Sequence, residues 1–401
     1  MLLIRADDLA KNCTEVYNYD NGGNILSTKV YPLTWGSLDG VTATSTLNYT
    51  YGDSNWKDKL TAYGSMAITY DAIGNPLTYR GYTLTWQNGR QLASMRFGTV
   101  NIGFTYDVDG LRTSKTVHNV DLEHKYYYVG NRLQYETIGD SSALWYFYDA
   151  DGNPSGIRYK DNSGTINDYY FVCNWRGDVI QIYNASGTLV GSYTYDAWGK
   201  VTENATSADT QNITETNPIR YRGYYYDTET RLYYLKSRYY DPAVKRFLNG
   251  DKLLCTTERV GFNLYAYCYN NPSINKDPNG NCPYNGTMAD FRRFEHGLPP
   301  IGCTCNTNKG NNSTQRNVVM SKKATNRRDS GLSGYSDEEI KSKARDKSLP
   351  GKERRRYQEE EKVRGLRNKQ KRASHFSFDD SVDLAIGVSL ITASIGLTGY
   401  V

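Results

Sequence analysis

The sequence predicts a mainly β fold: a spiral of β-hairpins forms a shell or part of one, and a small, mostly α C-terminal segment follows. Two observations predict it, an excess of tyrosine and a short motif that recurs along the first 280 residues. The 401 residues include 37 Tyr against 10 Phe, and 33 of the tyrosines precede residue 281. Tyrosine combines a high strand propensity with a hydroxyl that keeps a polar partner. This composition suits a thin sheet that is wet on one or both faces better than a thick apolar core.

The recurring motif is a Tyr-Asp pair followed by a turn. The pairs are Tyr19-Asp20, Tyr70-Asp71, Tyr106-Asp107, Tyr148-Asp149, Tyr195-Asp196, Tyr226-Asp227 and Tyr240-Asp241, and in five of them a glycine stands three residues after the Asp: Gly23, Gly74, Gly110, Gly152 and Gly199. We expect the Asp to cap the turn by accepting hydrogen bonds from backbone N–H groups, and the Gly to take a positive φ. Alternating aromatics before the pair, as in Phe104 and Tyr106, share one face of a strand. Stacked hairpins of this kind bury a continuous face, so the chain should wind as a long sheet.

A longer ordered pattern closes this region. Its blocks are Asn217–Asp227 (NPIRYRGYYYD), Arg231–Pro242 (RLYYLKSRYYDP), Arg246–Leu248 (RFL), Asn263–Tyr267 (NLYAY), Asn270–Pro272 (NNP) and Asp277–Gly280 (DPNG). With the Tyr-Asp repeats, the pattern resembles the RHS or YD-repeat family and its RHS repeat-associated core domain, over about residues 15–280. The resemblance implies a hollow β-shell that a core domain plugs at one end and that holds a C-terminal toxin or other effector. We therefore expect repeats over residues 1–215, the core domain over 216–280 and a variable effector segment over 281–401.

The resemblance also implies self-cleavage. In many family members the core domain cuts the chain just after itself, with aspartyl-protease-like chemistry at two Asp-Pro-x-Gly motifs, in which two close carboxyls share one proton. Transferred to this chain, the catalytic residues are Asp251 and Asp277, and the cleavage region is Gly280 and Asn281. The second motif is intact, although Asn281 replaces the usual bulky apolar residue. The first departs from the pattern, because Lys252-Leu253-Leu254 follow Asp251. The alternative is that both aspartates only cap turns.

A strongly basic stretch follows the core. Residues 311–373 carry a net charge of +10 within a chain of +5. Ser336 to Glu339 form a capping box that opens the first of two predicted helices between residues 336 and 373. The run that follows the second helix has no acidic residue and predicts contact with nucleic-acid phosphates through Arg364, Arg367, Lys369, Lys371 and Arg372. The alternative is a solvated helical hairpin laced with ion pairs.

Two further features of the C-terminal segment are ambiguous. Residues 384–401 form an uncharged stretch of 18 residues, which reaches the lower bound for a membrane span but also suits a buried element of a small effector domain. Four potential zinc ligands lack a Cys-x-x-Cys spacing, so free thiols or a chance disulfide are favoured over a metal site, and no metal or cofactor is predicted. The four residues are Cys282, His296, Cys303 and Cys305.

Two functions from different classes fit these features. The first is a secreted or cell-surface RHS-type polymorphic toxin, with its own C-terminal segment as cargo, a cognate immunity protein as partner, and nucleic acid or a membrane as target; a nuclease is one form of it. The second is a non-enzymatic cell-wall or surface adhesion protein that its tail anchors. The chain opens without a signal-peptide pattern and the first repeat begins almost at once, which predicts a piece of a longer protein.

Overall fold

A computed structural model describes residues 2–252, 259–281, 342–343 and 345. The chain divides into two compact units, Met1–Asn308 and Lys309–Val401. The architecture below is that of the first unit. The predicted helices over residues 336–373 lie outside the described residues, except for three helical positions at 342, 343 and 345.

The described part of the first unit is built almost entirely from antiparallel strands that pair with their neighbours in sequence. One sheet has six strands in chain order, β1 (Arg5–Asp8), β2 (Cys13–Tyr19), β3 (Ile25–Pro32), β4 (Ser45–Thr50), β5 (Ala62–Tyr63) and β6 (Met66–Ala67). The next has 14 strands, also in chain order: β7 (Thr69–Tyr70), β8 (Pro76–Tyr79), β9 (Tyr82–Gln87), β10 (Gln91–Phe97), β11 (Val100–Tyr106), β12 (Arg112–Val117), β13 (Leu122–Val129), β14 (Arg132–Ile138), β15 (Ser142–Tyr148), β16 (Pro154–Lys160), β17 (Ile166–Cys173), β18 (Val179–Asn184), β19 (Leu189–Tyr195) and β20 (Val201–Ala205). We call these two sheets the wall.

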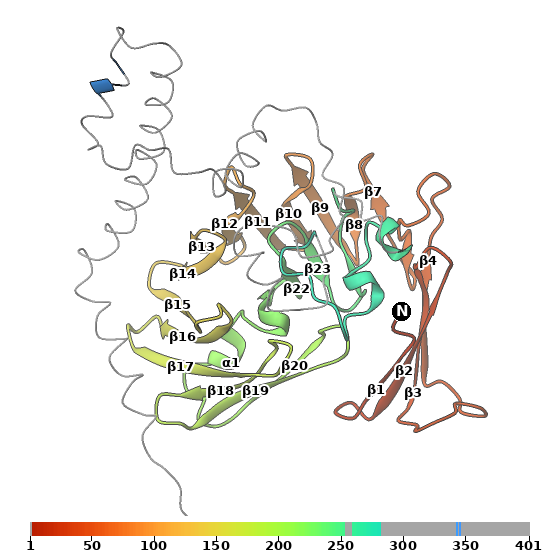
Figure 1. Cartoon of the computed structure of the whole chain (residues 1–401), viewed down its shortest axis with the longest axis horizontal. Coiled ribbons are helices and arrows are strands. Elements are labelled where there is room, and N and C mark those ends of the chain that lie inside the picture. The colour runs from red at the N-terminus through yellow and green to blue at the C-terminus, as the bar shows by residue number, and fades with distance from the viewer. Residues whose placement is uncertain (1, 253–258, 282–341, 344, 346–401) are drawn as a thin grey trace, which may run out of the picture. The chain divides into compact units, whose positions relative to one another are not determined.

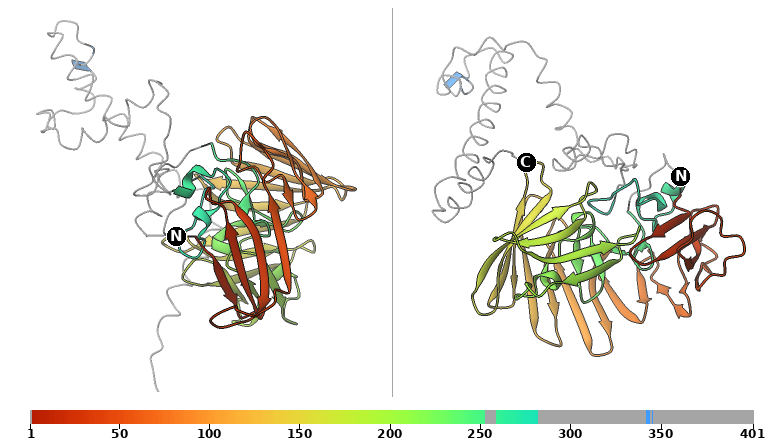
Figure 2. Two further views of the ribbon diagram at one scale, coloured as in Figure 1. Left: turned by 90° about the vertical axis from the view of Figure 1, so that its right-hand side faces the viewer. Right: turned by 90° about the horizontal axis from the view of Figure 1, so that it is seen from below.

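The third sheet belongs to residues 216–280, which we call the core block. It has four strands, β21 (Tyr225–Asp227), β22 (Leu232–Tyr234), β23 (Tyr239–Asp241) and β24 (Arg246–Phe247). Short helices flank it: α1 (Ile213–Thr216), η1 (Tyr221–Gly223), η2 (Arg259–Phe262) and η3 (Cys268–Asn270). The wall curves around this small sheet, which lies on its inner side (Figures 1 and 2). A mainly β spiral of hairpins is therefore confirmed.

The predicted turn chemistry is present in detail. In one copy Asp149 Oδ1 accepts the backbone N–H of Asp151 (3.0 Å) and of Asn153 (2.8 Å), while Gly152 has a φ of +83°. The five glycines predicted to take a positive φ all do so. The same double acceptance recurs at Asp20, Asp71, Asp107, Asp161, Asn174, Asn184 and Asp196. Three of these turns, at Asp161, Asn174 and Asn184, lack the Tyr-Asp pair and were not predicted.

The tyrosines of the wall Tyr-Asp pairs all make the same kind of hydrogen bond. Its hydroxyl donates to a backbone carbonyl in the preceding part of the wall, which ties one hairpin to the one before it. The bonds run from Tyr19 to Leu3 (2.7 Å), Tyr70 to Leu60 (3.0 Å), Tyr106 to Leu92 (3.0 Å), Tyr148 to Leu133 (2.6 Å) and Tyr195 to Val179 (2.7 Å). Phenylalanine could not make this bond, which gives tyrosine an advantage at these five positions.

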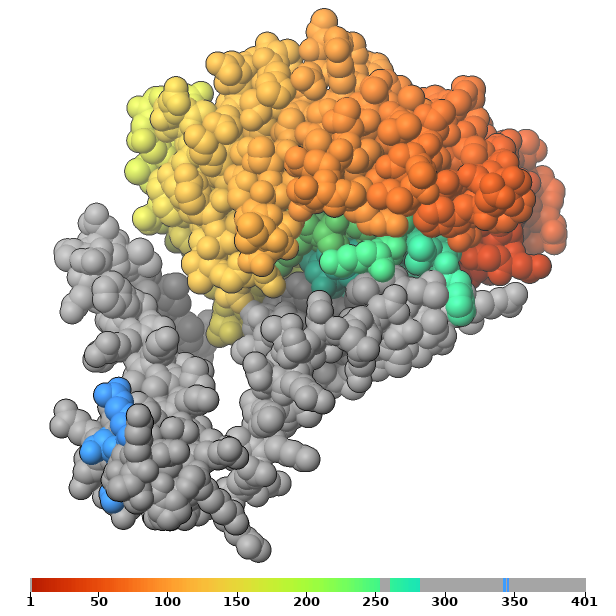
Figure 3. Space-filling model, turned by 90° about the horizontal axis from the view of Figure 1, so that it is seen from above, coloured from red at the N-terminus to blue at the C-terminus, as the bar shows by residue number. Residues whose placement is uncertain are grey.

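The core block is fastened to the wall at the turns. Tyr233 donates to the carbonyl of Gly199 (2.8 Å), Tyr265 to that of Gly74 (2.8 Å) and Tyr240 to that of Trp198 (2.7 Å). A buried ion pair joins the two parts as well, because Arg112 of β12 donates to both carboxylate oxygens of Asp227 at 2.6 and 3.1 Å. In the space-filling view the core block is visible only as a band below the wall (Figure 3). The wall thus covers one side of the core block, which carries the candidate site.

Candidate active site

The two aspartates predicted from the sequence meet at one guanidinium group. Arg238, in the turn between β22 and β23, places Nη2 2.8 Å from Asp251 Oδ2 and 3.7 Å from Asp277 Oδ2. The three side chains are 5%, 8% and 0% exposed, respectively. Two carboxyls buried this deeply need a compensating cation, a shared proton or both. Arg238 contacts both carboxyl groups and so links them. The sequence analysis did not single out this arginine.

Arg238 is held rigidly. Its Nη1 donates to the carbonyl of Leu264 (2.9 Å), and its Cζ lies 3.5 Å from the ring centroid of Phe247. A guanidinium fixed by stacking and by several acceptors loses little further entropy when it binds another oxygen. That further oxygen is the carbonyl of Gly280, which accepts a hydrogen bond from Nε.

The predicted cleavage region runs directly through this site. The backbone N–H of Asn281 donates to Asp277 Oδ1 (3.1 Å) and also to Asn279 Oδ1 (3.1 Å), and the carbonyl of Gly280 faces Arg238 Nε. The peptide bond between residues 280 and 281 therefore has a cation on its oxygen and a carboxylate on its nitrogen. This arrangement polarises a carbonyl and places a proton-transfer group beside the leaving nitrogen, which peptide hydrolysis requires.

The surroundings are buried and tyrosine-rich. Tyr224 accepts the backbone N–H of Asp277 (2.9 Å) and receives a hydrogen bond from the hydroxyl of Tyr267 (3.2 Å). Burial raises the pKa of both tyrosines well above the ordinary value. Burial, and then the charge of Asp277, also raises the pKa of the buried Cys268 thiol. Both tyrosines and the thiol are therefore neutral at ordinary pH.

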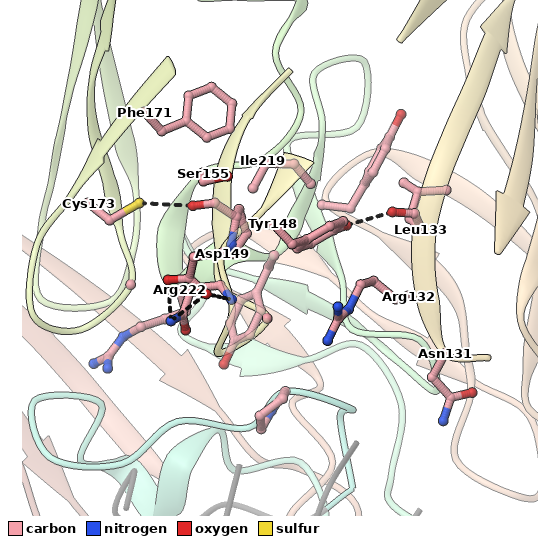
Figure 4. Close-up of a pocket in the computed structure, with 18 of the residues that line it drawn as sticks. Asn131, Arg132, Leu133, Tyr148, Asp149, Ser155, Phe171, Cys173, Ile219 and Arg222 are labelled. Carbon is pink, nitrogen blue, oxygen red and sulfur yellow. Dashed lines mark hydrogen bonds between the residues drawn. The ribbon is translucent and has the colours of Figure 1, made fainter. Parts of the chain in front are cut away.

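A cavity of about 740 Å³ borders the site (Figure 4). It lies between the inner face of the wall and the core block, where Arg132 and Tyr148 face the segment that carries Arg222. Lys276 and Pro278, on either side of Asp277, are part of its lining. The buried carboxylate of Asp277 is thus one residue away from a space that can hold water.

The departure of the first motif from the family pattern does not displace its aspartate. Asp251 reaches the site although Lys252 replaces the proline, and its backbone N–H donates to the carbonyl of Leu264 (2.9 Å). Residues 253–258 lie outside the described residues. The sequence analysis did not single out Arg238 or its neighbour Ser237, which the structure places at the candidate site. The need for a cation between two buried carboxylates was the signal that could have pointed to Arg238.

Several predicted sites fall outside the described residues. These are the basic run of Arg364, Arg367, Lys369, Lys371 and Arg372, the uncharged tail over residues 384–401, and Cys282, His296, Cys303 and Cys305. In the part of the chain that the structure describes, no group of three or more His, Cys, Asp or Glu side chains could hold a metal ion. Over the same part, no helix combines the length and the apolar character that a membrane span requires.

Comparison with known proteins connects this geometry to a family. A family model described as the teneurin YD-shell matches residues 163–273. The chain is 32% identical over 294 residues to the tRNA3(Ser)-specific nuclease WapA of Bacillus spizizenii, covering 70% of this chain and 11% of that protein. It is 25% identical over 308 residues to the double-stranded DNA deaminase toxin A of Burkholderia cenocepacia, covering 67% of this chain and 21% of that protein.

Among solved structures, the fold resembles that of the TcdB2-TccC3 complex. The TM-score is 0.51 at 20% sequence identity, and the match covers 67% of this chain and 14% of that one. The chain thus spans a small fraction of the length of the proteins that it matches. The wall of Tyr-Asp hairpins, the enclosed core block and these similarities agree: the chain is an RHS/YD-repeat protein.

Proposed function

We propose that this chain forms the end of an RHS shell that encloses its own C-terminal segment and releases it by cutting the chain after Gly280. The observation that carries the proposal is the position of the 280–281 peptide bond between Arg238 and Asp277. A bond that served only to close a turn would not need two buried carboxylates and a buried guanidinium around it.

The chemistry is hydrolysis by a carboxyl pair that shares one proton. Asp251 takes a proton from water, and the resulting hydroxide adds to the carbonyl carbon of Gly280 while Arg238 stabilises the charge on its oxygen. Asp277 gives its proton to the nitrogen of Asn281, and the C–N bond breaks. The products are a carboxylic acid on Gly280 and a free amine on Asn281, and the shared proton has moved from Asp277 to Asp251. Arg238 holds both carboxyls close to the bond, at 2.8 and 3.7 Å from its Nη2.

Self-cleavage is tested on the purified full chain. We expect a C-terminal fragment whose N-terminal residue is Asn281, with Asp277→Asn abolishing the cut and Asp251→Asn slowing it by roughly a hundredfold or more. Intact mass spectrometry with N-terminal sequencing measures both. A single intact mass after long incubation, unchanged by either substitution, contradicts the proposal.

The released segment over residues 281–401 is the proposed toxin. Two relatives are named for action on tRNA and on double-stranded DNA, and the basic stretch before residue 374 is suited to a polyanion. Delivery into a neighbouring cell from a secreted or cell-surface parent, and a cognate immunity protein in the producer, belong to the same proposal. Expression of residues 281–401 from an inducible promoter in a bacterium tests it. Growth arrest supports a toxin, whereas normal growth favours the adhesion protein with an anchoring tail.

A further inference from the structure

The turn between β22 and β23 makes contacts that the hydrolytic chemistry itself does not use. Ser237 donates twice to the carbonyl of Asn279, from its backbone N–H (3.2 Å) and from its hydroxyl (2.5 Å). Two donors converge on one backbone oxygen just ahead of the proposed scissile bond. The three consecutive residues 279, 280 and 281 are therefore each held by a different group, Ser237, Arg238 and Asp277.

The turn itself is rigid. The backbone N–H of Leu235 donates to the carbonyl of Arg238 (2.9 Å), and the N–H of Ser237 donates to the carbonyl of Leu235 (2.8 Å). Lys236 has a φ of +66°, a left-handed conformation that is unfavourable for a non-glycine residue. Such a conformation persists where the surrounding structure fixes it, so the turn is a template to which the 279–281 segment conforms.

Gly280 fits this template because it has no side chain. Its φ is +73°, and a Cβ atom there would lie 2.8 Å from Ser237 Oγ, 3.0 Å from the carbonyl oxygen of Leu235 and 3.3 Å from the backbone nitrogen of Arg238. Two of these three atoms are backbone atoms of the rigid turn, so they cannot move aside without displacing Arg238. A side chain at this position would push the carbonyl of residue 280 off the guanidinium.

We propose that this turn is the substrate clamp of the cleavage site: Ser237 is a positioning residue that fixes which peptide bond is cut, and the tight contacts select glycine before that bond. The inference rests on the proposed self-cleavage and adds its register and its specificity. A shift of the segment by one residue would bring a different carbonyl to Arg238, and the two bonds from Ser237 oppose such a shift. Misplacement of a reacting bond by about 1 Å can lower a rate roughly a hundredfold.

The test uses the full chain and follows both the rate and the position of the cut. Ser237→Ala removes one of the two donors and should slow cleavage by roughly tenfold, the factor that about 1.4 kcal/mol gives. It should also yield fragments that begin at residues neighbouring 281, which sequencing of the fragments detects. Ser237→Thr restores the hydroxyl and should restore a single start at Asn281. Loss of a purely structural bond would lower stability without moving the cut.

Gly280→Ala should slow the cut by roughly a hundredfold or more. Gly164→Ala is its matched control, because Gly164 has a φ of +87° with nothing within 4 Å of a Cβ atom, and it should cleave at the wild-type rate. Wild-type cleavage by both Gly280→Ala and Ser237→Ala, at the same bond, overturns the clamp while the self-cleavage stands. A parent chain that is never cut overturns both.

Discussion

At the scale of single residues, the repeat depends on a hydroxyl. Every wall tyrosine that precedes a turn aspartate donates to a carbonyl one hairpin back, and such a bond contributes about 1 kcal/mol net. Tyr148→Phe should therefore lower the free energy of unfolding by about 1 kcal/mol in denaturant titrations. Tyr127→Phe is the control, since that ring is 49% exposed on the same wall, and it should change the unfolding free energy little. Equal effects of the two changes would contradict a special role for the motif tyrosine.

The glycines of the turns offer a second test at this scale. Gly74 and Gly164 have almost the same φ, +85° and +87°, but a Cβ at Gly74 would lie 2.4 Å from Tyr265 Oη and 2.7 Å from the ring of Trp56. Gly164→Ala should cost about 1 kcal/mol from the backbone alone. Gly74→Ala should cost about 1–3 kcal/mol more, because it also dislodges a core-block tyrosine from the wall. Thermal melting of the two variants, compared with the parent, measures the difference; identical melting would mean that Tyr265 is not a fastening point.

At the scale of elements, strands of the wall and the core block share a buried network of charges. Glu136 of β14 lies 2.6 Å from His124 Nδ1 of β13 and accepts the hydroxyl of Tyr225 of β21 (2.8 Å). Burial alone would raise the pKa of Glu136, but its hydrogen bond with His124 and the charge of that histidine outweigh burial and lower the pKa below 4.5. Burial alone would also raise the pKa of Glu229. The charge of Lys115 and its hydrogen bond to Glu229 outweigh burial, so that pKa is lowered as well.

This network makes the joint between wall and core block sensitive to acid. A carboxyl whose pKa is lowered by folding adds stability above its unfolded pKa and loses it as the pH falls through the folded value. The melting temperature of the full chain should therefore fall as the pH drops below about 4.5. Glu136→Gln keeps the shape of the side chain and removes its titration, so the variant should be less stable at neutral pH and show a shallower acid dependence. A variant with the parent's pH profile would show that Glu136 does not contribute to it.

The sequence predicted the hairpins because their determinants are local. An Asp, a Gly three residues later and alternating aromatics lie within one turn and its strand, and all act over a few ångströms. The turn at Asn174 was missed because Asn replaces Asp and Cys173 replaces Tyr, although an amide oxygen caps the same backbone groups. The role of Arg238 could not be predicted, because its partners lie 13 and 39 residues away in the sequence and only the packing of the core block brings them together.

At the scale of the whole molecule, the charge of the chain is divided between its parts. Residues 311–373 carry +10, so the remainder of the chain is negative. The released segment contains five basic residues in a run without acidic side chains: Arg364, Arg367, Lys369, Lys371 and Arg372. If the segment acts on nucleic acid, replacing these five residues by Gln should weaken its binding to duplex DNA or RNA. The affinity of the parent should fall steeply with salt, because each phosphate contact releases about one counterion. A salt titration beside liposome flotation measures this, and flotation without nucleic-acid binding would point instead to a membrane target.

Hydrogen bonds between the N-terminal part of the wall and the core block imply an order in which these contacts form during translation. The backbone N–H of Leu3 donates to the carbonyl of Asn270 (2.9 Å), and the Asn270 side chain donates to the carbonyl of Gly23 (2.5 Å). A ribosome makes Leu3 and Gly23 long before Asn270. These two residues can therefore form their hydrogen bonds with Asn270 only after the core block has been translated. Everything that follows Asn281 is translated later still. If the segment after Asn281 is released as proposed, the described strands and the core block that they contact have been translated before that segment.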